Sequence, residues 1–297
     1  MDIKQLRFLD ALAQEKHFGR AAAACFITQP TLSLRIRQLE NELGIPLIQR
    51  GNRFEGLTPE GERVLAWARR VLSNYEGLQQ EISLIRDDLH GTLKLGIIPS
   101  ALPFSAQLTT PFLQKYPRVA VISRSDSADE INQALESFAL DLGISYLSRQ
   151  LPKNLQTQAL YCESYVALVP KAMYEQRFRE RDELTWLEAA ELPLCLLTGD
   201  MHNRWIIEDT LEKLGCSVQP QLQSSSLMTL YAHVMSGHWA TIVPSFHAQS
   251  VAIPASVKIL ALHAPYVEHP VGLIWREAEP LSPLVAAFCA MAIQVSA

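Results

Sequence analysis

The sequence lacks the residue spacings of metal sites and of disulfide frameworks. Its five cysteines form no CxxC pair, and its eight histidines form no HExxH pattern. An odd number of scattered cysteines argues against a disulfide framework, and a bound metal would need clustered ligands. We therefore expect no metal and no cofactor.

An export signal and a membrane-spanning run are also missing. Met1-Asp2-Ile3-Lys4 leads directly into an amphipathic pattern rather than an apolar signal core. The least charged stretch, residues 280–297, is interrupted by prolines, serines and a glutamine. The sequence predicts a soluble, cytoplasmic protein, and 297 residues with 48% hydrophobic content predict two or three domains.

A strong positive charge is absent as well, since the formal net charge is −5. Residues 1–58 carry eight Lys and Arg against six Asp and Glu, so the acidic balance lies downstream. The basic residues of this first segment cluster near one helix and one hairpin. A small basic face on an acidic protein favours site-specific DNA binding over nonspecific coating.

The stretch Thr28–Gly44 predicts an amphipathic helix. Thr28 caps its start, Pro30 lies in its first turn, and Gly44 ends it. Apolar side chains recur at helical spacing along one face, at Leu32, Ile36, Leu39 and Leu43. The opposite face carries Thr31, Leu34, Arg35 and Gln38. This helix is expected to bury one face and to offer the other.

A second short helix is predicted just upstream, over Phe18–Phe26, with alanines that allow close helix packing. Residues 3–15 predict a further helix that packs behind both. Two short helices joined by a turn near Ile27 form the arrangement that places a recognition helix in the DNA major groove. On these residues alone, an ordinary packed helical hairpin remains an open alternative.

An ordered series of motifs extends this pattern. The series is FGRAA, TQPTLS, RQLENELGIPLIQR and TPEGE, all within residues 18–62. It resembles the N-terminal winged helix-turn-helix of LysR-type transcriptional regulators, and the layout of the remaining chain fits the same family. The resemblance implies a homodimer or homotetramer that binds operator half-sites in double-stranded DNA and contacts RNA polymerase.

The DNA contacts are expected on the second helix and on the wing. Residues 46–57 predict two short strands around Gly51-Asn52, which form the wing. The expected groove and base contacts are Gln29, Pro30, Thr31, Ser33, Leu34 and Arg35, and the expected phosphate or minor-groove contacts are Arg37, Arg50 and Arg53. Many relatives carry a polar or basic residue where this chain has Leu34, which is suited to touch a thymine methyl group. For Arg50 and Arg53, solvated surface arginines are the alternative. Residues 1–58 are the predicted DNA-binding domain.

Residues 59–89 predict a long helix with an unbroken heptad stripe, which starts at Thr58-Pro59 and ends at His90-Gly91. A helix of this length with one apolar seam needs a partner, and a second copy of the chain is the simplest one. In the family this linker helix pairs two DNA-binding domains. Packing on its own domain is the alternative.

Residues 90–297 alternate short β-rich runs with helices, which predicts α/β units with a largely parallel sheet. The expected strands are 92–98, 119–123, 140–144, 165–169, 194–197, 221–224, 240–243, 257–262 and 271–275, and the expected helices are 104–115, 129–138, 184–190, 203–214, 227–236 and 282 onward. The family resemblance implies two lobes like those of periplasmic binding proteins. Lobe I is placed at about 90–161 and 266–297, and lobe II at about 162–265.

A ligand is expected in the cleft between these lobes, beyond strand ends and at helix N-termini. The candidate loops are 99–103, 198–203 and 243–245, and the expected effector contacts are Ser100, Ala101, Ser127, Tyr146, Thr198, Met201, Asn203 and Pro244. Helix N-termini and hydroxyls favour a small anion, such as a carboxylate. Helix capping is the alternative role for Ser100 and Ser127.

The sequence also bears on other classes of function. His202 has no accompanying nucleophile and acid in sequence, so an enzyme is not expected. A thiol-based sensor would use Cys195, with Cys216 as its partner, and a two-lobed solute-binding protein or enzyme would carry the helical domain incidentally. The SALP loop with PLCLLTGDMHNR resembles regulators encoded beside formate dehydrogenase genes. The effector, the target genes and the sign of regulation stay open.

Overall fold

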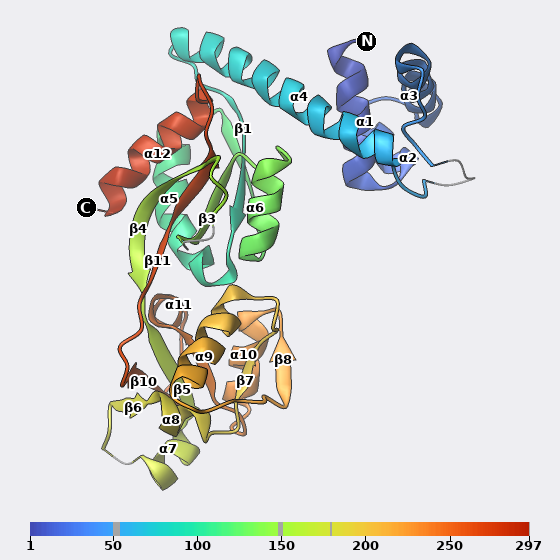
Figure 1. Ribbon diagram of the computed structural model, residues 1–297. Coiled ribbons are helices and arrows are strands. Elements are labelled where there is room, and N and C mark those ends of the chain that lie inside the picture. The colour runs from blue at the N-terminus through green and yellow to red at the C-terminus, as the bar shows by residue number, and fades with distance from the viewer. Residues whose placement is uncertain (50–53, 148–150, 179, 297) are drawn as a thin grey trace. The chain divides into compact units, whose positions relative to one another are not determined.

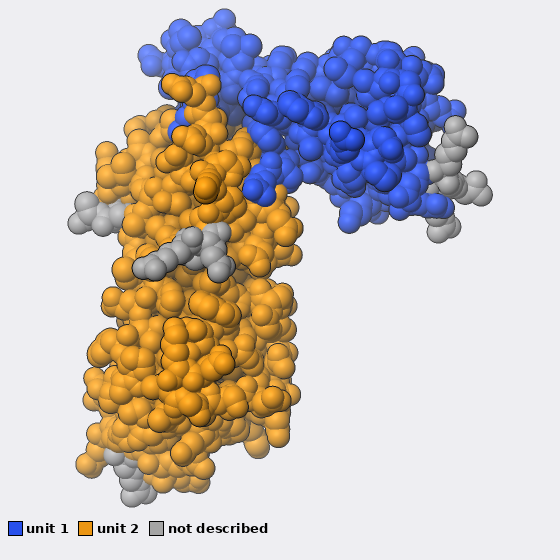
Figure 2. Space-filling view, in the orientation of Figure 1, with its two compact units in different colours: residues 1–91, 136–139, 280–283 blue, residues 92–135, 140–279, 284–297 orange. Residues whose placement is uncertain are grey.

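The computed structural model describes residues 1–49, 54–147, 151–178 and 180–296. The chain divides into two compact units, one made of residues 1–91, 136–139 and 280–283 and the other of residues 92–135, 140–279 and 284–297 (Figures 1 and 2). None of the described helices is long and apolar enough to cross a lipid bilayer.

The first unit is built from helices around a small apolar core. These are α1 (Ile3–Glu15), α2 (Phe18–Ala24), α3 (Gln29–Leu43) and α4 (Pro59–Ile85). Side chains cap the helix starts as the sequence predicts, since Thr28 accepts from the Thr31 amide and Thr58 from the Gly61 amide. The side chains buried in this core include Leu9, Leu12, Leu32, Ile36 and Leu39. The predicted apolar stripe of α3 is therefore confirmed.

Two arms follow α3 and pair before α4 begins. Ile48 and Leu57 form an antiparallel bridge, and the Gln49 amide donates to the Gly56 carbonyl at 3.0 Å. The tip of the predicted wing, with Arg50 and Arg53, lies outside the described residues.

Helix α4 is shorter than the sequence predicts. It ends at Ile85, because the amides of Arg86 and Asp88 turn back onto the Ser83 carbonyl. The predicted end at residue 89 is therefore wrong, and Leu89 is a buried residue beyond the helix. Ala68 and Leu72 pack against Leu6 of α1.

In the second unit, one sheet contains β1 (Gly91–Ile97), β2 (Val119–Ser125), β3 (Leu142–Tyr146), β4 (Leu155–Glu163) and β11 (His269–Arg276), in the order β2-β1-β3-β11-β4. Strands β1 and β3 are parallel, whereas β11 runs antiparallel to both β3 and β4. The prediction of a largely parallel sheet is wrong here. The helices that lie between or after these strands along the chain are η1 (Pro99–Ala101), α5 (Leu102–Lys115), α6 (Ala128–Glu136) and α12 (Pro283–Ser296).

A second sheet in this unit has the order β6-β10-β5-β9, built from β5 (Tyr165–Pro170), β6 (Glu183–Thr185), β9 (Thr241–Pro244) and β10 (Val257–His263). Strands β7 (Cys195–Leu197) and β8 (Leu222–Ser224) form a parallel pair. The helices are α7 (Lys171–Arg177), α8 (Trp186–Ala190), α9 (His202–Lys213), α10 (Leu227–Met235) and α11 (Ser245–Ser250). The predicted helix at 184–190 is wrong at its start, because 183–185 form β6.

The chain crosses between these sheets twice, and Figure 1 shows both crossings. It leaves the first sheet at Glu163, the end of β4, and enters the second at Tyr165, the start of β5. It returns between His263 of β10 and His269 of β11. Elements on the two sides of the crossings form a cavity, which is described next.

Candidate functional sites

Helix α3 offers one continuous exposed face. Leu32, Ile36 and Leu39 are buried, so the side chains between them point outward. Of the predicted groove contacts, Gln29, Pro30, Thr31, Leu34, Arg35 and Arg37 are exposed, and Ser33 is half-buried. Leu34 is 56% exposed, so its methyl groups are accessible on this face. An exposed helix face with hydroxyl, amide and guanidinium groups has the donors and acceptors that read base edges.

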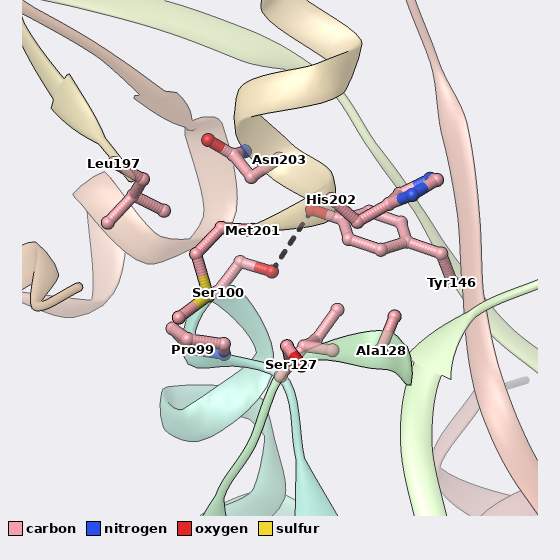
Figure 3. Close-up of a pocket in the computed structure, with 10 residues that line it drawn as sticks. Pro99, Ser100, Ser127, Ala128, Tyr146, Leu197, Met201, His202 and Asn203 are labelled. Carbon is pink, nitrogen blue, oxygen red and sulfur yellow. Dashed lines mark hydrogen bonds between the residues drawn. The ribbon is translucent and has the colours of Figure 1, made fainter. Parts of the chain in front are cut away.

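A small cavity lies in the second unit, where several helices begin (Figure 3). Its volume is about 10 Å³, room for a single water-sized group. It is lined by Ile98, Pro99, Ser100, Ser127, Ala128, Tyr146, Leu197, Met201, His202 and Asn203. The starts of η1, α6 and α9 meet there, so backbone N–H groups with partial positive charge surround it.

Several polar groups at the cavity have unused hydrogen-bonding capacity. Asn203 is only 5% exposed, and neither its amide nitrogen nor its amide oxygen has a partner among the described residues. The start of α9 has no side-chain cap. The Ser100 hydroxyl lies 3.4 Å from the Tyr146 hydroxyl, the contact drawn in Figure 3. Buried polar groups without partners are costly, which favours a ligand at this position.

A buried carboxyl lies behind Tyr146. The Tyr146 hydroxyl donates to Glu163 Oε1 at 2.5 Å, and the Tyr165 hydroxyl donates to the same oxygen at 3.3 Å. Glu163 Oε2 is buried and has no partner among the described residues. Burial raises the pKa of Glu163 to about 7, although hydrogen bonds from Tyr146 and Tyr165 oppose the rise. Burial, together with the Glu163 charge, raises the pKa of Tyr146 well above its usual value.

Two histidines complete the surroundings of the cavity. The His202 ring lies 4.7 Å from the Tyr146 ring and stacks on Trp205 at 5.1 Å. His269 pairs with Glu163 in the register of β11 and β4. Burial lowers the pKa of His202, and the nearby His269 lowers it further. Burial also lowers the pKa of His269. Both rings are therefore mostly neutral at pH 7.

The structure places the predicted effector residues unequally. Ser100, Ser127, Tyr146, Met201 and Asn203 line the cavity, whereas Ala101, Thr198 and Pro244 are not among its lining residues. The Thr198 hydroxyl is buried without a partner among the described residues. Ser127 accepts from the Glu130 amide and donates to the Glu130 carboxylate. It therefore caps α6, which is the alternative role that the sequence offered for this residue.

Sequence reasoning missed Glu163 and Tyr165, and it considered His202 only as a catalytic base. A signal was present in the run YCESY, residues 161–165. Alternate residues of an extended chain share one face, so a glutamate between two tyrosines predicts a hydroxyl–carboxyl cluster.

The Cys195 thiol, on which the alternative redox sensor depends, is poorly suited to oxidation. Cys195 is fully buried, its sulfur lies 3.9 Å from the Leu230 carbonyl oxygen, and burial raises its pKa to about 11. The thiolate is the reactive form, so this environment opposes reaction. Among the described residues, no group of three His, Cys, Asp or Glu side chains is placed to hold a metal ion.

Comparison with known families decides the identity of both units. Residues 3–62 match the bacterial regulatory helix-turn-helix protein of the lysR family, and residues 86–297 match the LysR substrate binding domain. The chain belongs to the LysR family. It is a LysR-type DNA-binding transcriptional regulator with an effector-binding domain, and the predicted family and fold class are confirmed.

Individual relatives cover nearly the whole regulator. It is 27% identical over 290 residues to the DNA-binding transcriptional dual regulator OxyR of Escherichia coli strain K12, covering 95% of this chain and 91% of that protein. It is 28% identical over 250 residues to the HTH-type transcriptional regulator XapR of the same strain, covering 84% of each.

Solved structures agree with this fold. A full-length OxyR variant with a single substitution, from Pseudomonas aeruginosa, matches with a TM-score of 0.77 at 27% identity, covering 99% of this chain and 94% of that one. Full-length CbnR complexed with its target DNA matches with a TM-score of 0.71 at 19% identity, covering 99% and 100%. The CbnR likeness concerns the fold alone.

Proposed function

We propose that this LysR-type regulator binds operator DNA through α3 and senses a small anionic metabolite in the cavity lined by Ser100, Tyr146 and Asn203. One observation carries the sensing part: Asn203 is buried in the cavity with both amide atoms free of partners among the described residues. A ligand with an anionic oxygen would accept from the Asn203 amide and from the uncapped start of α9.

The proposed domains are those predicted from the sequence. Residues 1–58 bind DNA, residues 59–89 link and dimerise, and residues 90–297 bind the effector. Within the effector domain, lobe I comprises about 90–161 and 266–297, and lobe II about 162–265. Both crossings of the chain between the two sheets support this division.

The DNA contacts proposed are the exposed groups of α3, namely Gln29, Pro30, Thr31, Leu34, Arg35 and Arg37, together with the half-buried Ser33. Arg35 and the residues before it face the bases, and Arg37 meets a phosphate. Arg50 and Arg53 stay predicted phosphate or minor-groove contacts. The regulator would act in the cytoplasm, without catalysis, as a homodimer or homotetramer that reads two half-sites and contacts RNA polymerase.

A thiol-based response is the weaker candidate. The similarity to OxyR supports a thiol-based response, but the burial and the raised pKa of Cys195 oppose formation of a thiolate. The cavity therefore supports a ligand-binding sensor better than a thiol sensor.

The test of the DNA-binding part is binding of the full chain to the DNA upstream of its own gene, against a scrambled duplex. At about 150 mM salt a specific regulator should prefer the real fragment by the order of 10³. Arg35→Ala should cost ~1–3 kcal/mol and relax the preference at one base pair. Arg37→Ala should weaken binding to every sequence and reduce the salt slope by about 1.

Lys153→Ala is the matched control, since Lys153 is an exposed cation of the effector domain. It should leave DNA binding unchanged. Equal loss in all three variants would mean that general charge, rather than the face of α3, governs binding, and the proposed DNA-reading role of that face would then be wrong.

A further inference from the structure

The cavity poses a charge problem for an anionic ligand. Its lining among the described residues contains no lysine or arginine. Arg204 follows Asn203 directly, but its guanidinium is bound to Glu208 at 2.6 Å and to the Leu197 carbonyl at 3.3 Å. The neutral donors of Asn203 and the helix starts are therefore the groups available to an anion.

The Glu130 carboxylate accepts from the Ser127 amide at the start of α6, and the ionisable acid that is buried beside the cavity is Glu163. It is joined to the cavity by a relay, because Ser100 Oγ lies 3.4 Å from the Tyr146 hydroxyl, which in turn donates to Glu163 Oε1. In a buried setting two negative charges at such short range repel strongly. An anion would thus bind far better when Glu163 is neutral.

We propose that this regulator binds a small monoanion together with one proton, and that the carboxyl of Glu163 holds the proton. This inference rests on the proposed function. The pair enters with no net charge, which suits a buried cavity without a cation. Glu163 Oε2 is the place for the proton, since both tyrosine hydroxyls donate to Oε1 and Oε2 has no partner among the described residues.

The groups that face Glu163 come from each surrounding element, and they are Ser100 of η1, Tyr146 of β3, Tyr161 of β4, Tyr165 of β5 and His269 of β11. The tyrosines stay protonated because burial raises their pKa values. His269 is titratable, and so is His202, whose ring lies beside that of Tyr146; burial lowers the pKa of each. Glu163, with a pKa raised to about 7, changes charge between pH 6 and 8.

The sign of the pH dependence follows from this. Below the pKa of Glu163 the acid is already neutral, and the anion affinity is at its maximum. Above that pKa a proton must be taken up on binding, so the affinity falls about tenfold per pH unit. Between pH 6 and 8.5 the expected total loss is about 30-fold for a pKa of about 7.

The size of the cavity sets the class of ligand. About 10 Å³ admits one water-sized group, so the cavity must open to admit any carboxylate, and carboxylates of one or two carbons need the least opening. Formate and acetate are the probes, and butyrate is the oversized comparison. We expect both small anions to bind more tightly than butyrate.

The experiment is calorimetric titration of the full chain with formate and acetate from pH 6 to 8.5. Buffers with different ionisation enthalpies count the protons taken up. The wild type should take up close to one proton at pH 8.5 and almost none at pH 6. Glu163→Gln should take up none, and at pH 8.5 it should bind within about twofold of the wild type at pH 6, because a neutral amide resembles the protonated acid.

Histidine variants separate the competing explanation. A protonated His202 or His269 would also strengthen anion binding at low pH. His202→Gln and His269→Gln should keep the 30-fold pH dependence if Glu163 is responsible. If either variant loses that dependence while Glu163→Gln keeps it, the inference is wrong.

A second variant guards against misfolding of Glu163→Gln. Tyr165→Phe removes one donor to the ionised carboxyl, so the pKa of Glu163 should rise and the fall in affinity should begin at higher pH. An unchanged midpoint would overturn the inference. Absence of formate and acetate binding in a wild type that still reads its operator would also overturn it and leave the DNA-binding function intact.

Discussion

At the scale of single residues, Gly61 is the tightest point of the first unit. A Cβ added there would lie 2.1 Å from the Leu47 carbonyl oxygen, whereas a Cβ at Gly77 of the same helix would meet nothing within 4 Å. The glycine in TPEGE therefore lets α4 pass against the strand arm that follows α3. Its role is close approach of two backbones rather than a turn.

We predict that Gly61→Ala destabilises the first unit by ~2–3 kcal/mol, because backbone atoms must move apart. Gly77→Ala should instead stabilise α4 by ~0.5–1 kcal/mol, since alanine is the better helix former. Hydrogen–deuterium exchange of the amides in α1–α3 measures the opening of this unit. Equal exchange in the two variants would contradict the packing described for Gly61.

At the scale of elements, the second half of α4 carries apolar side chains that this chain leaves uncovered. Leu78, Ile82 and Ile85 are 59%, 45% and 76% exposed. They belong to the predicted heptad stripe, whose earlier member Ala68 packs on α1. Covering each with a second copy of α4 would contribute ~1.5–3 kcal/mol.

We predict that Leu78→Glu combined with Ile82→Glu dissociates the oligomer. Charged groups cannot be buried in a helix seam, so sedimentation should report the 33.2 kDa chain as a monomer. The control is Gln79→Glu, which adds charge at an exposed position beside the seam. An unchanged mass of the double variant would place the interface elsewhere.

Elements were predictable from sequence where one face is buried and the caps are strong. Helix α3, with its Thr28 cap and its leucine stripe, is confirmed almost to the residue. Strand β4 was missed, because its burial alternates irregularly and four of its nine residues are exposed. The antiparallel insertion of β11 between β3 and β4 depends on pairing across more than a hundred residues, which local patterns do not encode.

The candidate cavity was predictable in part for the same reason. Ser100, Met201 and Asn203 lie at helix starts that come soon after strand ends, which local patterns reveal. Glu163 comes from a crossing between two sheets, and its neighbours Tyr146 and His269 reach it through strand pairing. Their meeting is a property of the tertiary fold rather than of any one segment.

At the scale of the whole molecule, a regulator of this kind must couple its cavity to its DNA-reading helix. Coupling is a difference in the affinity of one ligand caused by the other, and it is equal in both directions. We predict that a saturating small carboxylate changes operator affinity by some factor, and that saturating operator changes carboxylate affinity by the same factor. Values of about 5–150-fold are typical.

Fluorescence anisotropy with labelled operator gives the first factor, and calorimetry of the protein–DNA complex gives the second. Asn203→Leu is the control, since it removes the unpartnered amide of the cavity and should make operator affinity independent of the carboxylate. Two unequal factors in the wild type would mean that the carboxylate acts at more than one place.

A single residue, Ser164, separates the last position of β4 from the first position of β5. Glu163 and Tyr165 on either side of it hold the buried carboxyl cluster. A link this short has no slack, so retuning the ligand preference at these positions also alters the connection between the two sheets. A biosensor engineered from this chain would therefore need its selectivity and its dynamic range optimised together, and it would have to be calibrated against the acidity of the cell that carries it.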